Sequence, residues 1–555
     1  MRPDTRVAKA TATPLLLLAL LAAPPQALAD ISGTVVDATS ADPIEGAVVG
    51  IRARPDIPTV TSAADGSYVL PLTGDEFGDG VIPEIYASVA YDHAAPVNYH
   101  NEAMQVFDGM TGVAIALQRI PDTEPASYTP PSAGTCAGCH GNYFAQWMSS
   151  RHAGAAINPW VRDLFSGDGT AGGAAGYVFR DTHDPGETGF CATCHAPLED
   201  VFTPGQLMFD EVSSEAGLDG VTCLGCHQLA HVNDDVAALH HLGNGEYRFP
   251  DGMGGTFMHV WGPLPDVDTA VMRSSWSPQF EDPKFCASCH EYDNPDTGAP
   301  GQTTYSEWLA SPYAEPGPGH RTCQNCHMPA LDTVGYIANG GPERPVGQRH
   351  SHAFVGATPT TLAANIDLRL RLEREDDELV VVAEVENQCG HNFPTGISIR
   401  NALLVLDASI DGVPLVQSAG DTVPWWADDE VPGQQPGDYA GAPGRGFAKL
   451  LQGRINGQGA VESPVLFIDA ESVAANTAIP SGATDTSSYR FVLPPGFEGK
   501  TADVQARLLY RRAWRALAVT KGWTQTPSGM PVEIEVKAVD RQLILTDPIF
   551  HDGFE

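Results

Sequence analysis

The chain has 555 residues, enough for about three or four domains at the usual ~100–200 residues each. Its formal net charge of −38 disfavours binding to nucleic acid or to anionic lipid. A charge of this sign suits basic partner proteins, metal cations or simply solubility.

Residues 1–29 are typical of a secretory signal peptide. The basic residues Arg2, Arg6 and Lys9 precede a short apolar core, and the small residues Ala27 and Ala29 mark a cleavage site. The core is too short to span a bilayer, and an uncleaved anchor is the alternative. The signal peptide predicts export to the periplasm, or to the extracellular space or cell surface. No later apolar run is long enough for a membrane span, so we expect the rest of the chain to be soluble.

Residues 30–119 contain no cysteine and alternate short β-branched runs with turn signals such as Asp42-Pro43 and Asp65-Gly66. This pattern predicts a small antiparallel β-sandwich. The stretch also resembles the carboxypeptidase-regulatory-like module, which implies a non-catalytic β-sandwich used for display or docking. The residues that carry this resemblance are Gly33, Asp37, Pro43, Ile44, Gly46, Ala47, Val48, Asp65, Gly66 and Tyr68.

A Pro-rich linker at 120–134 leads into a segment, 135–358, that contains five C-x-x-C-H motifs. This is the attachment pattern of c-type haem, in which two thiols form thioethers with the haem and the adjacent histidine becomes the proximal iron ligand. A zinc site or disulfides are the alternatives, but neither explains a histidine directly after every second cysteine. In chain order, motifs 1 to 5 are Cys136, Cys139 and His140; Cys191, Cys194 and His195; Cys223, Cys226 and His227; Cys286, Cys289 and His290; and Cys323, Cys326 and His327.

The sequence therefore predicts five covalently bound haem c groups in one domain. The close spacing of motifs 2 and 3, and of motifs 4 and 5, suggests two closely packed haem pairs. Macrocycles of this size replace much of an ordinary apolar core, so short helices and irregular loops suffice around them.

Residues 359–546 show β alternation, because Leu368, Leu370 and Leu372 point one way and the intervening charges the other. This predicts a second, larger β-sandwich. Residues 547–555 form a short acidic-aromatic tail, which resembles a C-terminal tag of exported bacterial proteins or is a frayed terminus. The predicted fold is multidomain, with a mainly α or irregular pentahaem cytochrome c domain between two antiparallel β-sandwich domains.

The phrase "ENQCGHNFPTG", which follows a predicted strand of this second sandwich, holds the eleventh cysteine, Cys389. The haem motifs use the other ten, so Cys389 is a free thiol, a small buried residue that orders the turn, or a dimer bridge. Gly390 and Pro394 indicate a tight turn that would project His391 from the rim of the sandwich. We expect His391 to lie opposite a motif histidine and to close the haem domain.

The haem segment resembles the multihaem cytochrome superfamily that includes hydroxylamine oxidoreductase and its tetrahaem acceptor, cytochrome c-554. The phrases "CAGCHGNYFAQWMSSRHA", "GVTCLGCH", "TYSEWLASPYA", "TCQNCHMP" and "GHNFPTG" carry this resemblance, which covers residues 135 to 523. It implies closely stacked haems that mostly have two histidine ligands. It also implies that His152, His231, His352 and His391 are distal ligands, with surface or structural roles as the alternative for each.

The fifth distal ligand stays open at this stage. His350 neighbours His352 in the phrase "RHSHAFVG", and five other histidines compete for the place. They are His183, His240, His241, His259 and His320.

The superfamily contains electron carriers and enzymes, so the resemblance does not decide between them. An enzyme needs an iron with an open coordination position. Pentahaem nitrite reductases have a C-x-x-C-K motif there, whereas all five motifs here end in histidine. We therefore expect an electron carrier with unidentified redox partner proteins; the alternatives are an oxidoreductase of a small nitrogen or sulfur compound and a structural or adhesive protein.

One residue is a candidate for an open haem site. "EWLASPYA" repeats "QWMSSRHA" and has Tyr313 where the first copy has His152. A tyrosine can ligate haem iron, line an open site, or simply pack at the end of a helix.

Overall fold

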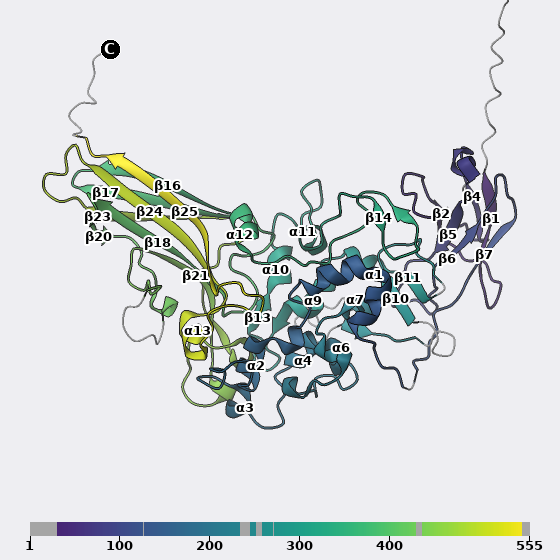
Figure 1. The fold of residues 1–555 in the computed structure, drawn as a ribbon, viewed down its shortest axis with the longest axis horizontal. Coiled ribbons are helices and arrows are strands. Elements are labelled where there is room, and N and C mark those ends of the chain that lie inside the picture. The colour runs from purple at the N-terminus through teal and green to yellow at the C-terminus, as the bar shows by residue number, and fades with distance from the viewer. Residues whose placement is uncertain are drawn as a thin grey trace, which may run out of the picture.

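The computed structural model describes residues 30–80, 82–125, 127–233, 245–250, 258–269, 271–428 and 436–546. The predicted signal peptide, the C-terminal tail, His240 and His241 lie outside these ranges. The molecule is elongated, with an N-terminal β unit at one end, a large β-sandwich at the other, and the segment of the five motifs between them (Figure 1). None of the described helices is long and apolar enough to cross a membrane.

The N-terminal unit consists of two small sheets around one apolar core, which includes Ile31, Val49 and Ile115. The prediction of a wholly antiparallel arrangement is wrong in one pairing, because β1 and β7 are parallel. They are the first and last strands of the unit, so the chain passes through five other strands and supplies the long crossover that a parallel pair requires. One sheet has the order β4 (Ser67–Leu70), β1 (Ile31–Asp37), β7 (Val113–Leu117), and the other β3 (Val60–Thr61), β2 (Val48–Ile51), β5 (Glu84–Ser88), β6 (Glu102–Gln105).

The C-terminal sandwich has two antiparallel sheets. In its first strand Leu368 and Leu370 are buried while Arg369 and Arg371 are exposed, as the alternation predicts. One sheet has the order β16 (Ile366–Glu375), β17 (Glu378–Asn387), β23 (Thr484–Val492), β20 (Val416–Ala419). The other has β22 (Ser472–Asn476), β21 (Gly444–Gln452), β18 (Asn401–Ile410), β24 (Thr501–Arg511), β25 (Glu533–Ile544), with β19 (Val413–Pro414) beside β18.

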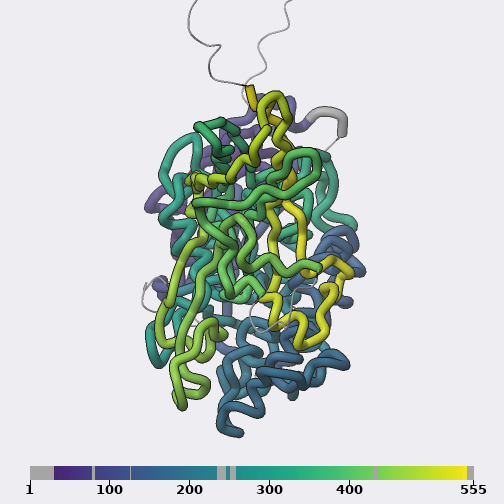
Figure 2. Tube along the Cα trace, turned by 90° about the vertical axis from the view of Figure 1, so that its left-hand side faces the viewer, coloured from purple at the N-terminus to yellow at the C-terminus, as the bar shows by residue number. Residues whose placement is uncertain are grey.

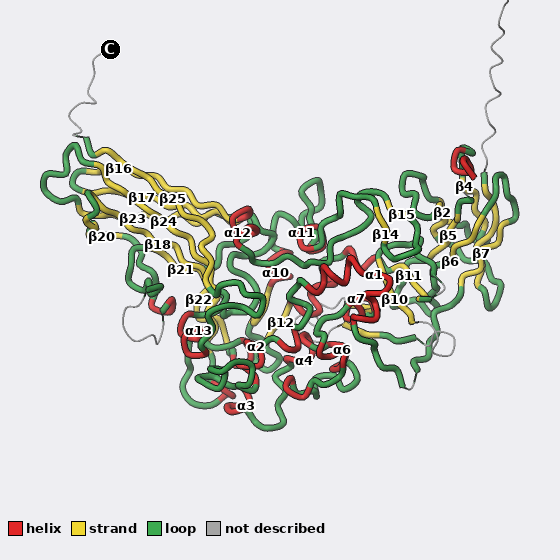
Figure 3. Tube along the Cα trace, in the orientation of Figure 1, coloured by secondary structure: helices red, strands yellow, loops and turns green. Residues whose placement is uncertain are grey.

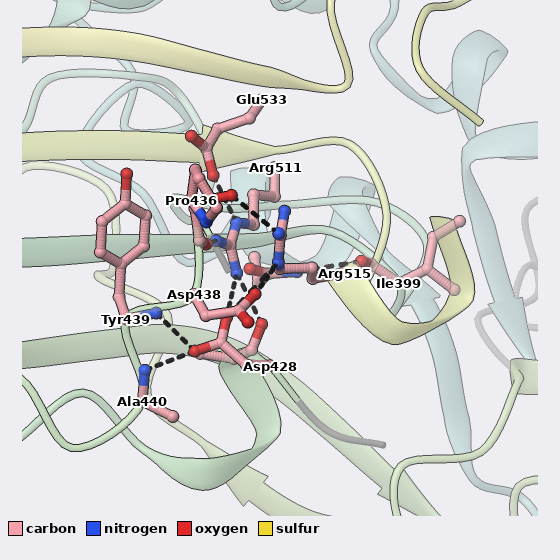
Figure 4. A network of polar contacts seen from close by, with 12 residues as sticks. Ile399, Asp428, Pro436, Asp438, Tyr439, Ala440, Arg511, Arg515 and Glu533 are labelled. Carbon is pink, nitrogen blue, oxygen red and sulfur yellow. Dashed lines mark hydrogen bonds and ion pairs between the residues drawn. The ribbon is translucent and has the colours of Figure 1, made fainter. Parts of the chain in front are cut away.

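A buried arginine fixes the loops at the edge of this sandwich (Figure 4). Arg511 is 2% exposed, and its guanidinium donates to Glu533 Oε2 at 2.7 Å, to the Ala427 carbonyl at 2.6 Å and to the Gly437 carbonyl at 2.7 Å. Asp428 lies 3.4 Å from the same guanidinium. Because the charge is fully paired and hydrogen-bonded, its burial is tolerated here.

The segment between the two β units consists of short helices, paired strands and loops, shown in red, yellow and green in Figure 3. The five motifs share one local feature: each forms a helical turn that ends or kinks at the motif histidine. Motifs 2, 3 and 5 are the whole of α4 (Cys191–His195), α7 (Cys223–His227) and α11 (Cys323–His327), and motif 4 closes α9 (Lys284–His290). Motif 1 lies inside α1 (Ala133–Met148), whose backbone departs from helical angles at His140.

The remaining elements of this segment are short. The helices are α2 (Pro159–Phe165), α3 (Phe179–Thr182), α5 (Pro197–Asp200), α6 (Glu215–Leu218), α10 (Thr304–Leu309) and α12 (Pro359–Asn365). The paired strands are β8 (Leu229–Val232) with β9 (Gly245–Tyr247), β10 (Met258–Gly262) with β11 (Met272–Trp276), β12 (Glu291–Asp293) with β13 (Pro300–Thr303), and β14 (Gly335–Tyr336) with β15 (Glu343–Arg344).

Both β units are joined to the middle segment by buried polar contacts. On the N-terminal side, Asp266 Oδ2 accepts from the backbone of Ala53 at 2.7 Å and from Arg344 at 2.5 Å, and Arg344 is 1% exposed. On the C-terminal side, Lys521 closes α13 (Arg515–Lys521) and reaches the segment after α2. In the view from the sandwich end, the yellow C-terminal chain lies beside this blue segment (Figure 2).

Candidate haem-binding site

None of the eleven cysteines, all of them among the described residues, forms a disulfide. Cys139 and Cys326 are exposed, and the other eight motif cysteines are partly buried. Threonine side chains order two of the motif turns, because Thr222 Oγ1 accepts from Gly225 and Thr322 Oγ1 accepts from Asn325. Paired thiols on one helical turn, followed by a histidine, are the donor set that covalent haem attachment requires.

Each motif histidine is held in place through its Nδ1 atom. The Nδ1 atoms of four of them lie 2.7–3.2 Å from a backbone carbonyl, which fixes Nδ1 as the donor. The pairs are His140 with Ile337, His195 with Ala155, His227 with Trp261, and His327 with Val355. In these four, anchoring of Nδ1 leaves Nε2 as the atom available to a metal, as in metal-ligating histidines generally. His290 differs, because its Nδ1 accepts from the side-chain amide of Gln302 at 3.2 Å.

Two motif histidines face a second histidine at a distance that fits an iron between them. The ring centroids are 6.4 Å apart both for His152 and His290 and for His391 and His327. Two imidazoles on opposite sides of one metal ion have centroids about 6 Å apart, because each metal–nitrogen bond is about 2 Å long. The planes of His391 and His327 are nearly parallel, at 12°, whereas those of His152 and His290 are inclined at 56°. The two ring separations therefore fit a pair of histidine ligands on one iron, and ligation itself stays a prediction.

The facing histidines lie in buried surroundings that favour the neutral ring. Burial lowers the pKa of His152 to about 4, and the nearby histidines His195 and His327 act in the same direction. Burial likewise lowers the pKa of His391 to about 4, and its Nδ1 lies 3.0 Å from the Asn392 carbonyl. The neutral ring, with Nδ1 as donor, is the form that ligates iron through Nε2.

His352 lies near motifs 1 and 3. Burial lowers its pKa to about 4, and the largest electrostatic contribution comes from His227, with a smaller one from His140. Its Nδ1 lies 3.0 Å from the His350 carbonyl, so here too Nε2 is the available nitrogen. His350 itself contacts the Met328 carbonyl through Nδ1 at 2.8 Å. The ligand roles of His352 and His350 stay predictions.

The structure places His231 against the N-terminal unit, where its ring stacks on His93 with centroids 4.2 Å apart and planes inclined by 5°. Its role as a distal ligand stays a prediction. Of the competing histidines, His183 has both ring nitrogens engaged, Nε2 at 3.0 Å from Asp469 and Nδ1 at 3.0 Å from Thr182 Oγ1. This arrangement favours a structural role for His183.

Two further competitors are placed without a clear ligand geometry. His259 is 2% exposed, and its ring lies 4.9 Å from that of His100, at the N-terminal unit. His320 lies 6.0 Å from the ring of Trp308.

Contacts between motif residues give the motifs a spatial order. The first cysteine of motif 1 lies against that of motif 3, and the first cysteine of motif 4 lies against that of motif 5. Cys194 of motif 2 lies against Cys289 of motif 4. Cys226 of motif 3 is also near Cys289: burial raises the pKa of Cys226 most, and the neighbouring Cys289 raises it further. Motif 4 is thus next to motifs 2, 3 and 5.

This order agrees with the sequence spacing. Motifs 4 and 5 are neighbours, and motif 3 also lies beside motif 2, because Leu224 packs in one buried cluster with Leu198, three residues after His195. The close haem pairs themselves stay a prediction. The chain also folds back at residues 220–221: Gly220 pairs with Ala153 in an isolated β-bridge, and Trp147 Nε1 donates to the Val221 carbonyl at 2.7 Å. These bonds bring motif 3 to the helix of motif 1.

Tyr313, the candidate for an open haem site, uses its hydroxyl in a structural bond. The hydroxyl donates to the Gln388 carbonyl at 2.9 Å, in the loop that holds His391. Cys389 is partly buried and packs against the core of the C-terminal sandwich. Neither observation assigns a catalytic role to Tyr313, and the dimer bridge through Cys389 stays a prediction.

Three residues that order the segments of His391 and His352 were not singled out from the sequence. Asn387 is fully buried; its amide donates to the His391 carbonyl at 2.9 Å and its oxygen accepts from the Cys389 amide at 2.9 Å. Glu307 accepts from the Asn392 amide at 3.2 Å, and Gln146 accepts from the His352 amide at 2.8 Å. The repeated phrases contain Gln146 and Glu307 at matching positions, so the repeat was the signal that could have found them.

No protein-family model matches the chain, and no curated protein matches it. Its fold is similar to the crystal structure of a penta-heme cytochrome c552 from Thermochromatium tepidum, with a TM-score of 0.51 and 21% sequence identity. The likeness covers 74% of this chain and 99% of that chain. The chain therefore contains the fold of a multihaem cytochrome c and extends beyond it.

Proposed function

We propose that this chain is an exported pentahaem c-type cytochrome that transfers electrons between partner proteins. The observation that carries the proposal is the placement of the motifs: five haem-attachment turns, each with an anchored histidine, adjoin one another in one continuous set. Haem c supplies one-electron redox chemistry when bound. The chain's own residues anchor it, ligate it and set its distance from the next motif.

The contacts between motifs suggest a branched path. Motifs 1, 3, 4 and 5 follow one another, and motif 2 lies beside motifs 3 and 4. Cys139 and Cys326 are the exposed motif cysteines and belong to motifs 1 and 5, so these two motifs are the proposed points of exchange with other proteins. A formal charge of −38 favours partners with a basic surface, which would associate rapidly at low ionic strength.

We assign the distal ligands from the same contacts. His152 is proposed for motif 4 and His391 for motif 5, because each lies 6.4 Å from the corresponding motif histidine. His352 is proposed as a distal ligand beside the motif 1 helix, because its amide donates to Gln146 at 2.8 Å and its ring lies 4.8 Å from that of Tyr143. The N-terminal unit is proposed to be a non-catalytic docking module.

The test combines mass spectrometry with redox spectroscopy on the purified, exported protein. Mass spectrometry should show the polypeptide with five covalent haems, and stepwise reduction should give low-spin spectra throughout. Little change on adding carbon monoxide or nitrite would support a carrier. A high-spin fraction that binds these ligands would favour the alternative, an oxidoreductase of a small nitrogen or sulfur compound, and a protein without covalent haem would refute both.

A further inference from the structure

The haem segment contains two copies of one local arrangement. In the first, residues 146–152 pack on motif 3; in the second, residues 307–313 pack on motif 5. Trp147 Nε1 donates to the Val221 carbonyl at 2.7 Å, and Trp308 Nε1 donates to the Arg321 carbonyl at 2.8 Å. Val221 and Arg321 each stand two residues before the first cysteine of their motif.

The backbone contacts of the two copies also match. The Val221 amide donates to the carbonyl of His152 at 3.1 Å, and the Arg321 amide donates to the carbonyl of Tyr313 at 3.0 Å. A serine two residues earlier accepts from the amide of His152 or Tyr313, at 3.2 Å in both copies. His152 and Tyr313 therefore occupy the same place in the repeated arrangement.

A side chain at the start of each copy holds a downstream histidine segment. Gln146 accepts from the amide of His352 at 2.8 Å. At the matching position, Glu307 Oε2 accepts from the amide of Asn392 at 3.2 Å and from the Thr395 hydroxyl at 2.5 Å. The two copies thus use the same position to hold the chain next to His352 in one case and His391 in the other.

The copies differ where the first has His152 and the second has Tyr313. His152 faces His290, whereas the Tyr313 hydroxyl donates to the Gln388 carbonyl at 2.9 Å. The loop also packs on this copy, because a Cβ placed on Gly390 would lie 3.6 Å from Trp308 and 3.8 Å from Tyr313. Tyr313 and Glu307 hold the loop on either side of His391, which lies 6.4 Å from His327.

We infer that Tyr313 and Glu307 are positioning residues for His391, and that they keep its ring at the distal side of the motif 5 haem. This inference rests on the proposed function. The sandwich holds the backbone of the loop at both ends, through β17 and through the β-bridge between Phe393 and Ile479. A ligand ring between these ends also needs contacts from the haem side to keep its position. Asn387 fixes the sandwich side, and α10 with Tyr313 fixes the haem side.

The experiment uses the full-length exported holoprotein and carbon monoxide as the probe of the reduced iron. Tyr313→Phe removes the hydroxyl that holds Gln388. Without this bond His391 is held less firmly at the iron, so carbon monoxide displaces it more easily. We expect the apparent affinity of a single haem for carbon monoxide to rise about fivefold to tenfold, which corresponds to the net free energy of one hydrogen bond. The matched control is Tyr68→Phe, which removes a tyrosine–carbonyl bond of 3.2 Å inside the N-terminal unit and should leave carbon monoxide binding unchanged.

Glu307 provides a second, independent arm. Glu307→Leu removes the acceptor for the Asn392 amide and should expose the same haem to carbon monoxide. Glu307→Gln should stay close to the wild type, because Gln146 performs the same contact in the other copy. The reduction potential of that haem should shift in Tyr313→Phe and Glu307→Leu and return in Glu307→Gln.

Other results would overturn the inference. If Tyr313→Phe and Glu307→Leu lower the thermal midpoint, as Tyr68→Phe does, while carbon monoxide affinity and potentials stay unchanged, the two residues only stabilise the fold. If His391→Gly leaves carbon monoxide binding unchanged in a protein with five haems, His391 is not a ligand and this inference fails, although electron transfer stands. A wild-type protein without covalent haem would instead refute the proposed function itself.

Discussion

Lys521 joins the C-terminal sandwich to the motif segment, and its replacement tests how firmly the two are coupled. The residue is 1% exposed, and its ammonium group donates to three backbone carbonyls. These belong to Asp163 at 3.0 Å, Gly173 at 2.5 Å and Tyr177 at 2.6 Å. Lys521→Met keeps the length of the side chain but removes the charge and all three bonds.

The expected cost follows from these contacts. A hydrogen bond from a charged donor contributes about 1.5–3 kcal/mol, so three give a gross loss of several kcal/mol. Part of this is offset, because the methionine no longer requires an ammonium group to leave water. Since three buried carbonyls lose their partner, a net loss of about 3–5 kcal/mol remains, which corresponds to a thermal midpoint roughly 6–20 °C lower at about 2–4 °C per kcal/mol.

The assay follows thermal unfolding by far-ultraviolet circular dichroism for the sandwich and by Soret absorbance for the motif segment. Both midpoints should fall together in Lys521→Met. Lys500→Met is the matched control in the same sandwich, since Lys500 is 45% exposed and its ion pair with Asp411 contributes at most about 1 kcal/mol. A midpoint for Lys521→Met within about 2 °C of that control would refute the reasoning, and a fall in only one signal would show that the two units unfold separately.

Two further predictions concern the same boundary. Burial opposes the charged form of His183, but the hydrogen bond and charge of Asp469 outweigh it and raise the pKa of His183. The pair therefore stabilises the fold fully at pH values below the ordinary histidine pKa of about 6.5. This stabilisation is lost as the pH rises through the raised pKa. The thermal midpoint of the wild type should therefore fall more between weakly acid and alkaline pH than that of His183→Gln, and parallel pH profiles would contradict this. For Cys389, a thiol reagent should titrate a single thiol in the denatured holoprotein and react slowly in the native one, because the residue packs against the sandwich core. More than one thiol would show incomplete haem attachment, and a dimer on non-reducing electrophoresis would support the bridge.

The sequence was informative wherever a pattern is local. A C-x-x-C-H motif is one helical turn, so spacing alone predicts that both thiols and the histidine leave the same short element. Alternation likewise identified the buried face of β16, with Leu368 and Leu370 inside. Alternation does not identify a strand's partner, and for that reason the parallel pairing of β1 and β7 was not predicted.

Contacts between distant segments could not be predicted in the same way. His152 lies near motif 1 in sequence, yet its ring faces His290 of motif 4. Spacing could not show this, because the fold-back at Val221 and the docking of the sandwich decide which motifs adjoin. The near-repeat pointed to Tyr313, but only the structure shows that its hydroxyl holds Gln388.

The polar contacts across the sandwich boundary explain why a β domain stands beside the haem motifs. Lys521, the His183–Asp469 pair and the Glu307–Asn392 bond all cross the same boundary. Redundant polar links of this kind fix relative position more than they add net stability, because each buried charge also loses its hydration. A distal ligand needs such fixing, since a displacement of about 0.5 Å already degrades a preorganised site. On the proposed function, the sandwich therefore acts as the rigid support of one haem ligand, and loosening the Glu307–Asn392 bond should first appear as a change at the motif 5 haem.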